Sequence, residues 1–481
     1  MTSANSELTF MSATTLAAAI RAKKVSPAEL LQAVYARIHE VNPRINAFAT
    51  LTEERALRAA KQAEDALMRG DPLGALHGLP ISVKDLLLTR GVRTTFGSRI
   101  RENHIPQEDA PAVDKVVAAG AIPIGKTTTP EFGFKAVTDS PLTGITRNPW
   151  DLSKTSGGSS GGAGAALAAG FGPLALGTDG AGSIRIPSSF NGIFGLKPSY
   201  GRVPVYPSNP VPFLSHVGPM TRSVRDAALL LNVIAAPDDR DLVSLPSGTT
   251  DYVTACDGGI RGLRVAWSAT LGYAKVDPEV AQLAEAAAKR FEASLGCQVE
   301  AIDPCFESPQ NFFAVLWTMS YALRFRALLP EWESRMDPDL VILIKGSEKF
   351  GPLDYGAALA KRYAIWAATR AFFDQFELLL TPTLPVPPFS AGRNAPEGLP
   401  DSVGALPPFP EWLPFTYPWN LTGQPAATVP CGFTRTGLPI GLQIVGRRFA
   451  DATVLRAAAA FEDAHPWTGK QPDFSSSLLT T

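Results

Sequence analysis

Apolar and polar positions follow two different periods along this chain, and the two periods alternate. Near the N-terminus, the capping box SPAE (26–29) precedes apolar residues at helical spacing, which predicts a helix. In GLPISVKD (78–85), Ile81 and Val83 alternate with polar residues, which is typical of a strand. Lys84 lies at or near the end of that predicted strand.

The same alternation continues through the rest of the chain. Residues 113–119 indicate a helix that Gly120 stops, and residues 121–124 indicate a second strand. Residues 224–234 predict another helix, and residues 437–464 predict a final strand-helix unit. Helices and strands in regular succession predict an α/β layer fold with a mostly parallel sheet.

One long segment breaks this pattern. Residues 381–418 contain 11 prolines, which predicts an irregular path before the final strand-helix unit. The aromatic residues in and beside this segment favour a packed wall: Phe409, Trp412, Phe415, Tyr417 and Trp419. A second aromatic group has near-helical spacing and predicts core packing, with a substrate-tunnel wall as the alternative: Phe312, Phe313, Trp317, Tyr321 and Phe325.

Composition and charge narrow the class of protein. The chain has 481 residues, of which 45% are hydrophobic and 19% are charged, a globular composition. The net charge is -1, so the sequence lacks the basic surplus of proteins that bind nucleic acid or anionic membranes. The N-terminus shows no secretory signal, and the apolar run 161–177 is short for a membrane span and contains Pro173. We therefore expect a cytoplasmic enzyme without a nucleic-acid or membrane partner.

Two short motifs match known functional patterns without the required context. GAIPIGKT (120–127) fits the P-loop pattern, but a helix precedes it and its middle residues resemble a strand, which argues against nucleotide binding. GGSSG (157–161) fits the nucleophile elbow G-x-S-x-G, but the residues before it are turn-like rather than an apolar strand. His216 or His465 would have to be the base of such a hydrolase.

A serine–lysine arrangement is a third interpretation of the same region. Ser183 follows three small residues (180–182), whose backbone N–H groups can converge on an oxyanion. A serine nucleophile needs a base, and a neutral lysine provides one without histidine. Lys84, after apolar residues at a strand end, is a candidate, although a solvated lysine beside Asp85 would explain the same pattern.

Longer runs of sequence favour the serine–lysine interpretation. The runs TSGGSSGGAGAALAAG (155–170) and LGTDGAGSIRIPSSFNGIFGLKPSYGRV (176–203) resemble the amidase signature family. Flanking runs agree with it over most of the chain: GLPISVKD, GKTTTPEFG, GITRNPWD, GPMTRSVRDAA and NLTGQPAATVPCG. The resemblance implies a single α/β domain with a mixed, mostly parallel twisted sheet covered by helices on both faces.

The resemblance also implies which residues form the catalytic triad. The family's Ser-cis-Ser-Lys triad corresponds to Ser183 as nucleophile, Ser159 as bridging serine and Lys84 as base. The bridging serine follows a cis peptide bond in the family, so a cis bond is expected between Gly158 and Ser159. The three side chains are expected to contact one another through hydrogen bonds.

Supporting residues follow from the same motifs. The resemblance assigns the oxyanion hole to the backbone N–H groups of Gly180, Ala181, Gly182 and Ser183. Supporting roles are expected for Ser160, Asp179 and Arg185. Arg185 is expected to anchor the structure rather than to bind a substrate carboxylate. No metal or organic cofactor is implied.

The implied activity is hydrolysis of a carbon–nitrogen amide bond through a serine acyl-enzyme. The implied partner is a small-molecule amide, best a hydrophobic or aryl amide, with side activity on esters or carbamates. The sequence leaves open whether the chain forms a homodimer.

Two alternatives stay open at this point. The glutamine-hydrolysing A subunit of the tRNA-dependent amidotransferase shares the fold and the triad. It usually carries glutamine where Ile186 stands and Asp-Gln-Ile where this chain has residues 215–217, so both departures favour a free-standing amidase. A catalytically inactive binding scaffold is the second alternative, and the complete triad argues against it.

One domain is expected over residues 1–481, with five consecutive parts. These are the N-terminal helices (1–70), a catalytic core with the serine-rich signature (71–235), a variable substrate-wall region (236–420), a C-terminal strand and helix (421–470) and a loose tail (471–481).

Overall fold

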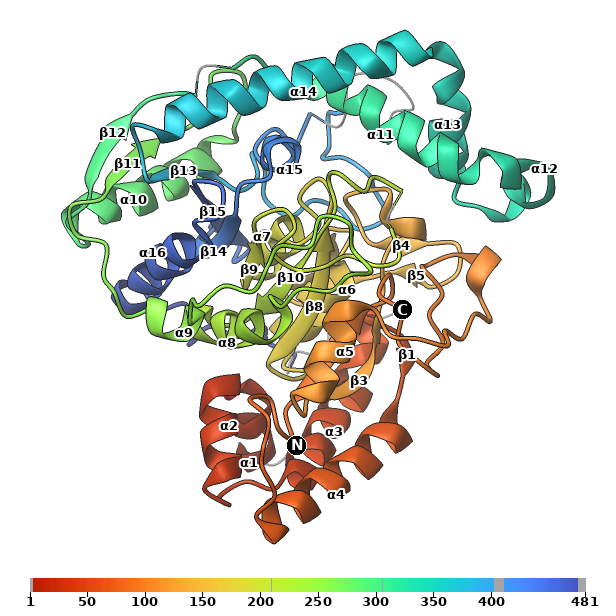
Figure 1. Ribbon diagram of the computed structural model, residues 1–481, viewed down its shortest axis with the longest axis vertical. Coiled ribbons are helices and arrows are strands. Elements are labelled where there is room, and N and C mark those ends of the chain that lie inside the picture. Colours follow the sequence, from red (N-terminus) through yellow and green to blue (C-terminus); the bar gives the residue numbers. More distant parts are fainter. Residues whose placement is uncertain (1–2, 209, 305, 402–410, 475–481) are drawn as a thin grey trace.

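An eleven-stranded sheet runs through the centre of the molecule (Figure 1). The computed structural model describes residues 3–208, 210–304, 306–401 and 411–474. Across the sheet the strands lie in the order β1 (Phe48–Leu51), β3 (Ile122–Thr127), β2 (Pro80–Lys84), β8 (Leu174–Asp179), β10 (His216–Thr221), β9 (Phe194–Lys197), β14 (Ala426–Phe433), β15 (Pro439–Gly446), β13 (Leu378–Pro382), β11 (Arg264–Trp267) and β12 (Gln298–Ala301).

The sheet is mixed, as expected, but the expectation that it is mostly parallel is wrong. β2 pairs in parallel with β3 and β8, and β11 pairs in parallel with β12 and β13. The other six of these ten pairings are antiparallel, including every pairing from β8 to β13 across the middle. The short turn around Gly437 joins β14 to β15 and permits only antiparallel pairing, whereas a helix separates β2 from β3.

The α-helices of the described residues follow one another between these strands. In chain order they are α1 (Ser3–Phe10), α2 (Ala13–Arg21), α3 (Pro27–Ile45), α4 (Glu53–Arg69), α5 (Pro111–Ala118), α6 (Gly161–Ala168), α7 (Arg185–Asn191), α8 (Val224–Ile234), α9 (Tyr252–Ala255), α10 (Pro278–Ala293), α11 (Gln310–Phe325), α12 (Leu329–Trp332), α13 (Pro338–Gly346), α14 (Pro352–Phe373), α15 (Pro418–Thr422) and α16 (Asp451–Ala464).

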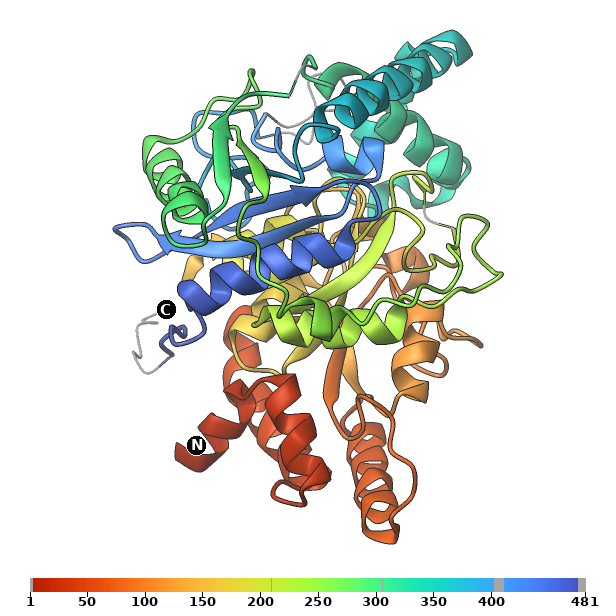
Figure 2. The ribbon, with the colours of Figure 1, turned by 60° about the vertical axis from the view of Figure 1, so that its left-hand side comes forward.

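Helices cover both faces of the sheet, as predicted (Figure 2). Ala163, Leu167 and Ala168 of α6 pack in a small apolar cluster that contains Ala175. α3, α8, α10 and α16 contribute to a larger cluster that contains Leu174 and Leu176. Successive residues of β8 therefore point into different clusters, as the alternation of side chains along a strand requires.

Local sequence signals placed several elements correctly. Ser26 caps α3, because its hydroxyl accepts hydrogen bonds from the backbone N–H groups of Ala28 and Glu29 at 3.1 and 3.4 Å. α8 begins and ends at the predicted residues. α5 ends before Gly120 and β3 follows it, so the P-loop-like run 120–127 lies in a turn and a strand.

The residues before the serine-rich signature were expected to be turn-like, and this expectation was incomplete. These residues form a short hairpin, β6 (Arg147–Asn148) with β7 (Asp151–Thr155), which follows the hairpin of β4 (Asp139–Ser140) and β5 (Gly144–Ile145). β7 pairs with β6 and is not a strand of the main sheet, so the arrangement still differs from a nucleophile elbow.

A second apolar core contains side chains of α11 and α13 together with residues of the loops that follow β3 and β8. It buries the predicted aromatic side chains Phe313, Trp317, Tyr321 and Phe325, while Phe312 is half-buried. The segment Gln310–Arg335 is apolar and long enough to cross a membrane, but 56% of its most apolar window is buried inside the protein. Burial of this kind is typical of a core helix.

The proline-rich segment forms part of the wall of this second core. Among its described residues, 383–401 and 411–417 contain no helix and no strand of the main sheet. Trp412 and Tyr417 are buried in this core, and Phe415 and Trp419 are buried in a neighbouring apolar cluster, which confirms the predicted packed wall. Phe409 and most of the predicted tail, 475–481, lie outside the described residues.

Candidate active site

The candidate site lies where two neighbouring parallel strands end. Lys84 is the last residue of β2, and Thr178 and Asp179 end β8 beside it. The loop 180–183 leads from β8 into α7. Because the carboxyl ends of parallel strands meet at one edge of a sheet, the predicted base and the predicted nucleophile loop come together there.

Lys84 is fully buried and has hydroxyl groups as its hydrogen-bond partners. Its ammonium nitrogen donates to Ser159 Oγ and Ser160 Oγ at 2.8 Å and to Thr178 Oγ1 at 2.9 Å. The sequence predicted the contact with Ser159, but Thr178 was missed, although it lies inside the quoted run LGTDG. Three hydroxyls match the three donors of an ammonium group.

Burial controls the protonation of this lysine. Loss of water around Nζ lowers the pKa of Lys84 well below its ordinary value, and the charge of Asp179 opposes that effect only in part. In the described part of the chain, Lys84 forms no salt bridge within 4.0 Å. The neutral amine, which can accept a proton, is therefore favoured at a lower pH than for a solvated lysine.

The two serines lie in a loop held tightly against its neighbours. The peptide bond between Gly158 and Ser159 is cis, as predicted. Gly161 permits close packing, because a Cβ atom there would lie 2.3 Å from the Thr138 hydroxyl, which accepts the Gly161 N–H bond. Ser160 donates its backbone N–H to the carbonyl of Ser183 at 3.2 Å, so this loop and the nucleophile loop are joined directly.

The position of Ser183 differs from the expectation in one respect. Ser183 is 7% exposed, and its backbone carbonyl is bonded to the Ser160 N–H. No hydrogen bond within 3.5 Å joins its hydroxyl to Ser159 among the described residues, so the predicted contact of all three side chains is wrong for this pair. Ser159 is instead directed to Lys84, which already has a full set of partners.

The backbone groups assigned to the oxyanion hole also divide into two kinds. The N–H of Gly182 donates to Asp179 Oδ1 at 2.8 Å, so it is not free for an oxyanion and the expectation is wrong for this residue. The N–H groups of Gly180, Ala181 and Ser183 donate to no acceptor in the described part of the chain. These three N–H groups, just before α7, are therefore free to donate to an oxyanion.

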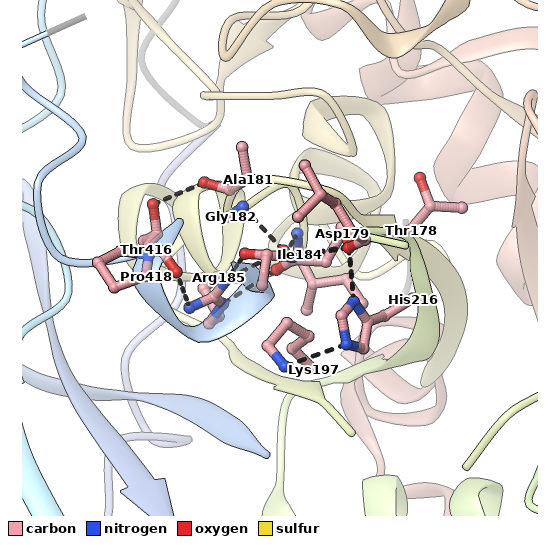
Figure 3. Close-up of polar contacts among 12 residues, drawn as sticks. Thr178, Asp179, Ala181, Gly182, Ile184, Arg185, Lys197, His216, Thr416 and Pro418 are labelled. Carbon is pink, nitrogen blue, oxygen red and sulfur yellow. Dashed lines mark hydrogen bonds and ion pairs between the residues drawn. The ribbon is translucent and has the colours of Figure 1, made fainter. Parts of the chain in front are cut away.

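Asp179 and Arg185 form a buried ion pair that organises the loop between them (Figure 3). The Arg185 guanidinium donates to both Asp179 oxygens, at 2.9 and 3.0 Å, and both side chains are inaccessible to solvent. Its remaining donors bind the Thr416 carbonyl, Gln443 and Asn420. Arg185 is thus an anchor, as expected, and all its directions are occupied.

Burial alone would raise the pKa of Asp179, but the charge and hydrogen bonds of Arg185 hold that pKa below its ordinary value. Asp179 therefore stays ionised and continues to accept the N–H groups of Gly182 and Ile184. Asp179 fixes the loop by accepting these backbone N–H groups, and Arg185 holds the carboxylate in place.

His216 has a structural role in this arrangement. Its Nδ1 lies 2.8 Å from the Leu214 carbonyl and 3.2 Å from the Asp179 carbonyl, and its Nε2 lies 3.4 Å from Lys197 Nζ (Figure 3). Burial, with the nearby charge of Lys197, lowers the pKa of His216 well below its ordinary value. The sequence missed Lys197, which lies in the quoted run GLKPSYG and is itself buried.

A pocket with a volume of about 590 Å³ opens beside this edge of the sheet. It reaches Thr178 and is lined mainly by apolar side chains, including Leu86, Phe132 and Phe325. Gly133 lies between Leu86 of the pocket wall and Ser159. A Cβ atom on Gly133 would lie 2.8 Å from Leu86 and 3.3 Å from Ser159 Oγ. The pocket therefore approaches the reactive groups from the Thr178 and Ser159 side.

Comparison with known proteins identifies the family. The model of the family described as Amidase matches residues 29–455. The chain belongs to the amidase signature family. An acylamidase from Rhodococcus erythropolis is 40% identical over 471 residues, covering 97% of this chain and 98% of the relative. The A subunit of glutamyl-tRNA(Gln) amidotransferase from Chloroflexus aggregans is 36% identical and covers 98% of this chain and 99% of its own length.

Solved structures agree with this membership in the amidase signature family. A bacterial aryl acylamidase of the family superposes with a TM-score of 0.88 at 32% identity, covering 96% of this chain and 97% of that one. The protein is an amide-hydrolysing enzyme. The alternative of an inactive binding scaffold is therefore set aside.

Arg185→Met tests the anchoring role of the ion pair. The substitution leaves Asp179 buried without its cation, so we expect the free energy of unfolding to fall by about 3–5 kcal/mol. Arg225→Met is the control, since Arg225 forms ion pairs with Asp257 and Asp463 at the surface and should cost about 0–1 kcal/mol. Urea unfolding followed by circular dichroism measures both, and equal losses would contradict the assignment.

Proposed function

We propose that Lys84, Ser159 and Ser183 hydrolyse an amide bond of a small molecule through an acyl-enzyme. The observation that carries this proposal is the buried amine of Lys84, hydrogen-bonded at 2.8 Å to Ser159 beside the loop of Ser183. A lysine whose neutral form is favoured by burial can act as a base, and a serine between it and the nucleophile can relay the proton.

In the proposed reaction, Ser183 Oγ attacks the carbonyl carbon of the amide. Its proton passes to Ser159, and the proton of Ser159 passes to the neutral amine of Lys84. The oxygen of the tetrahedral intermediate is held by the free N–H groups of Gly180, Ala181 and Ser183. This step requires the hydroxyls of Ser183 and Ser159 to come within hydrogen-bond distance, since no hydrogen bond joins them in the resting arrangement.

Collapse of the intermediate breaks the carbon–nitrogen bond and leaves an ester on Ser183. The proton on Lys84 returns through Ser159 to the departing amine, which leaves as a neutral molecule. Water then attacks the ester carbonyl and gives its proton to the same relay. Release of the carboxylic acid restores Ser183 and the neutral Lys84.

The walls of the pocket favour hydrophobic or aryl amides as substrates. Phe96, Phe132, Phe325 and Leu328 line it, and Phe132 stacks on Phe325 with ring centroids 4.2 Å apart. The relatives named acylamidase and aryl acylamidase agree with this proposal. Esters and carbamates present a similar carbonyl, so we infer side activity on both classes.

A second candidate function is glutamine hydrolysis as a subunit of an amidotransferase, which the 36% identity to that A subunit favours. Ile186 argues against it. Its side chain is buried, and its Cδ1 lies 2.9 Å from the position that a Cβ atom on Gly182 would take. An apolar side chain therefore stands beside the nucleophile loop where that subunit usually has a polar amide.

Substitution of the three residues tests the proposal. Ser183→Ala should lower kcat by about 10⁴-fold or more, because it removes the nucleophile. Lys84→Met and Ser159→Ala should each lower kcat by about 10²- to 10⁴-fold, because they remove the proton relay. Initial rates with an aryl acylamide, normalised to folded protein, measure the effect.

Two controls separate catalysis from stability in this experiment. Lys126→Met removes another fully buried lysine, on the neighbouring strand β3, and should preserve most turnover of the folded enzyme. His465→Gln removes a histidine that the nucleophile-elbow interpretation would need. A folded, inactive His465→Gln variant, or an active Lys84→Met variant, would refute the proposed base.

The pH dependence gives an independent test of Lys84. The protonated amine is inactive in this proposal, so kcat/KM should rise with pH through the pKa of Lys84 and then level off. Because burial lowers that pKa, the midpoint should lie below 10.5. A midpoint at or above 10.5, or one that moves in His465→Gln, would contradict this assignment.

A ranking of substrates separates the two candidate functions. We expect kcat/KM to be highest for an aryl acylamide, lower for a linear aliphatic amide and lowest for glutamine, because the pocket wall is mainly apolar. Each apolar contact of methylene size is worth about 1–3 kcal/mol of discrimination. The comparison uses purified protein alone, and a clear preference for glutamine would replace the amidase proposal with the amidotransferase subunit.

A further inference from the structure

Three charged side chains interrupt the apolar lining of the pocket. They are Arg101, Arg324 and Glu108, and they come from separate segments of the chain. Arg101 ends the short 3-10 helix 99–101, and Arg324 lies in the last turn of α11. Both arginines are exposed, so their guanidinium groups belong to the open rim and not to the buried floor.

The two arginines differ from their neighbours in having no acceptor. Neither Arg101 nor Arg324 forms a side-chain hydrogen bond or an ion pair with any described residue. Arg99 donates to the carbonyl of Pro141 at 2.8 Å, and Arg326 pairs with Glu348 at 2.9 Å. Arg99 and Arg326, which lie outside the pocket, thus have hydrogen-bond acceptors, whereas Arg101 and Arg324 on its rim, two residues away from them, have none among the described residues.

The single carboxylate on the rim is already occupied. Glu108 Oε1 accepts a hydrogen bond from the Tyr206 hydroxyl at 3.1 Å, and Oε2 lies 3.9 Å from an Arg240 guanidinium nitrogen. Arg240 also pairs with Asp114 and Asp238, so it is not a further free cation. The uncompensated charge at the rim is therefore that of Arg101 and Arg324.

We propose that this rim selects amides whose apolar body ends in a carboxylate or a similar planar anion, which Arg101 and Arg324 bind. The inference rests on the proposed amide hydrolysis at Ser183 and adds the substrate class. A guanidinium group offers paired N–H donors that match a carboxylate, and apolar walls below it concentrate its field at the mouth. The apolar body fills the pocket while the anion stays at the solvated rim.

Matched substrate pairs test the proposal. One series is the para-nitroanilide monoamides of linear dicarboxylic acids of increasing length, each compared with the neutral amide of its free acid group. A second series places the charge on the leaving group, with N-acyl-para-aminobenzoates compared with the corresponding benzamides. We expect kcat/KM to favour the anion over its neutral partner at the length that spans the pocket, in at least one series.

Substitution of the rim arginines should lower the preference for the anion and leave kcat/KM for the neutral partner unchanged. Arg101→Gln and Arg324→Gln should each lower the anion-to-neutral ratio of kcat/KM by about three- to tenfold, the range of an exposed charge-assisted contact. Raising the salt from about 0.02 M to about 0.5 M should lower the same ratio in the unmodified enzyme. Arg99→Gln and Arg326→Gln are the matched controls and should leave it unchanged.

The outcomes distinguish this proposal from the function on which it rests. If the neutral anilides are hydrolysed but the anions are never preferred at any length in either series, the rim proposal is overturned and the amidase proposal stands. A preference that survives Arg101→Gln, Arg324→Gln and the double substitution also overturns it. If neither member of any pair is hydrolysed, the failure lies with the proposed function.

Discussion

The buried ion pair of Asp179 and Arg185 is the interaction on which this site depends. Removing two charges from water costs free energy that only good geometry and further hydrogen bonds offset. Both conditions hold here, because Arg185 also binds Thr416, Asn420 and Gln443, which lie 231 to 258 residues away in sequence. One guanidinium group therefore joins the end of β8 to α15 and β15, and the carboxylate it stabilises fixes the loop that carries Ser183.

The same cost acts on every buried lysine among the described residues, so it does not by itself single out a catalytic base. Burial lowers the pKa of Lys84, Lys126 and Lys197 alike. Lys197 donates to the backbone carbonyls of Pro198 and Gln424. Lys126 donates to the Leu87 carbonyl and to the hydroxyls of Thr89 and Thr94, which lie outside the serine loop and the nucleophile loop. Lys84 donates only to hydroxyls, and one of these, Ser159, lies beside the nucleophile loop. Partners, rather than burial, distinguish the candidate base.

The sequence predicted what local signals and short motifs determine. The cap of α3, the bounds of α8 and the strand that ends at Lys84 follow from nearby residues, and the motifs selected the serine loop. The antiparallel centre of the sheet was not predicted, because it includes pairs of strands that lie far apart in sequence, such as β9 and β14. The sequence also did not predict the hydrogen bond from the Gly182 N–H to Asp179, because this bond depends on the orientation of one carboxylate within a buried loop.

Chemistry and selection are built from different parts of this fold. The reacting groups lie at strand ends and in glycine-rich loops whose neighbours leave no room for change, as the contacts around Gly161 and Gly182 require. The rim of the pocket comes from a short 3-10 helix and the last turn of α11, where side chains meet solvent and replacement is inexpensive. A change of arginine at the rim leaves the ion pair of Asp179 and the partners of Lys84 untouched. Substrate preference can therefore vary in this enzyme without disturbing the groups that hold the nucleophile.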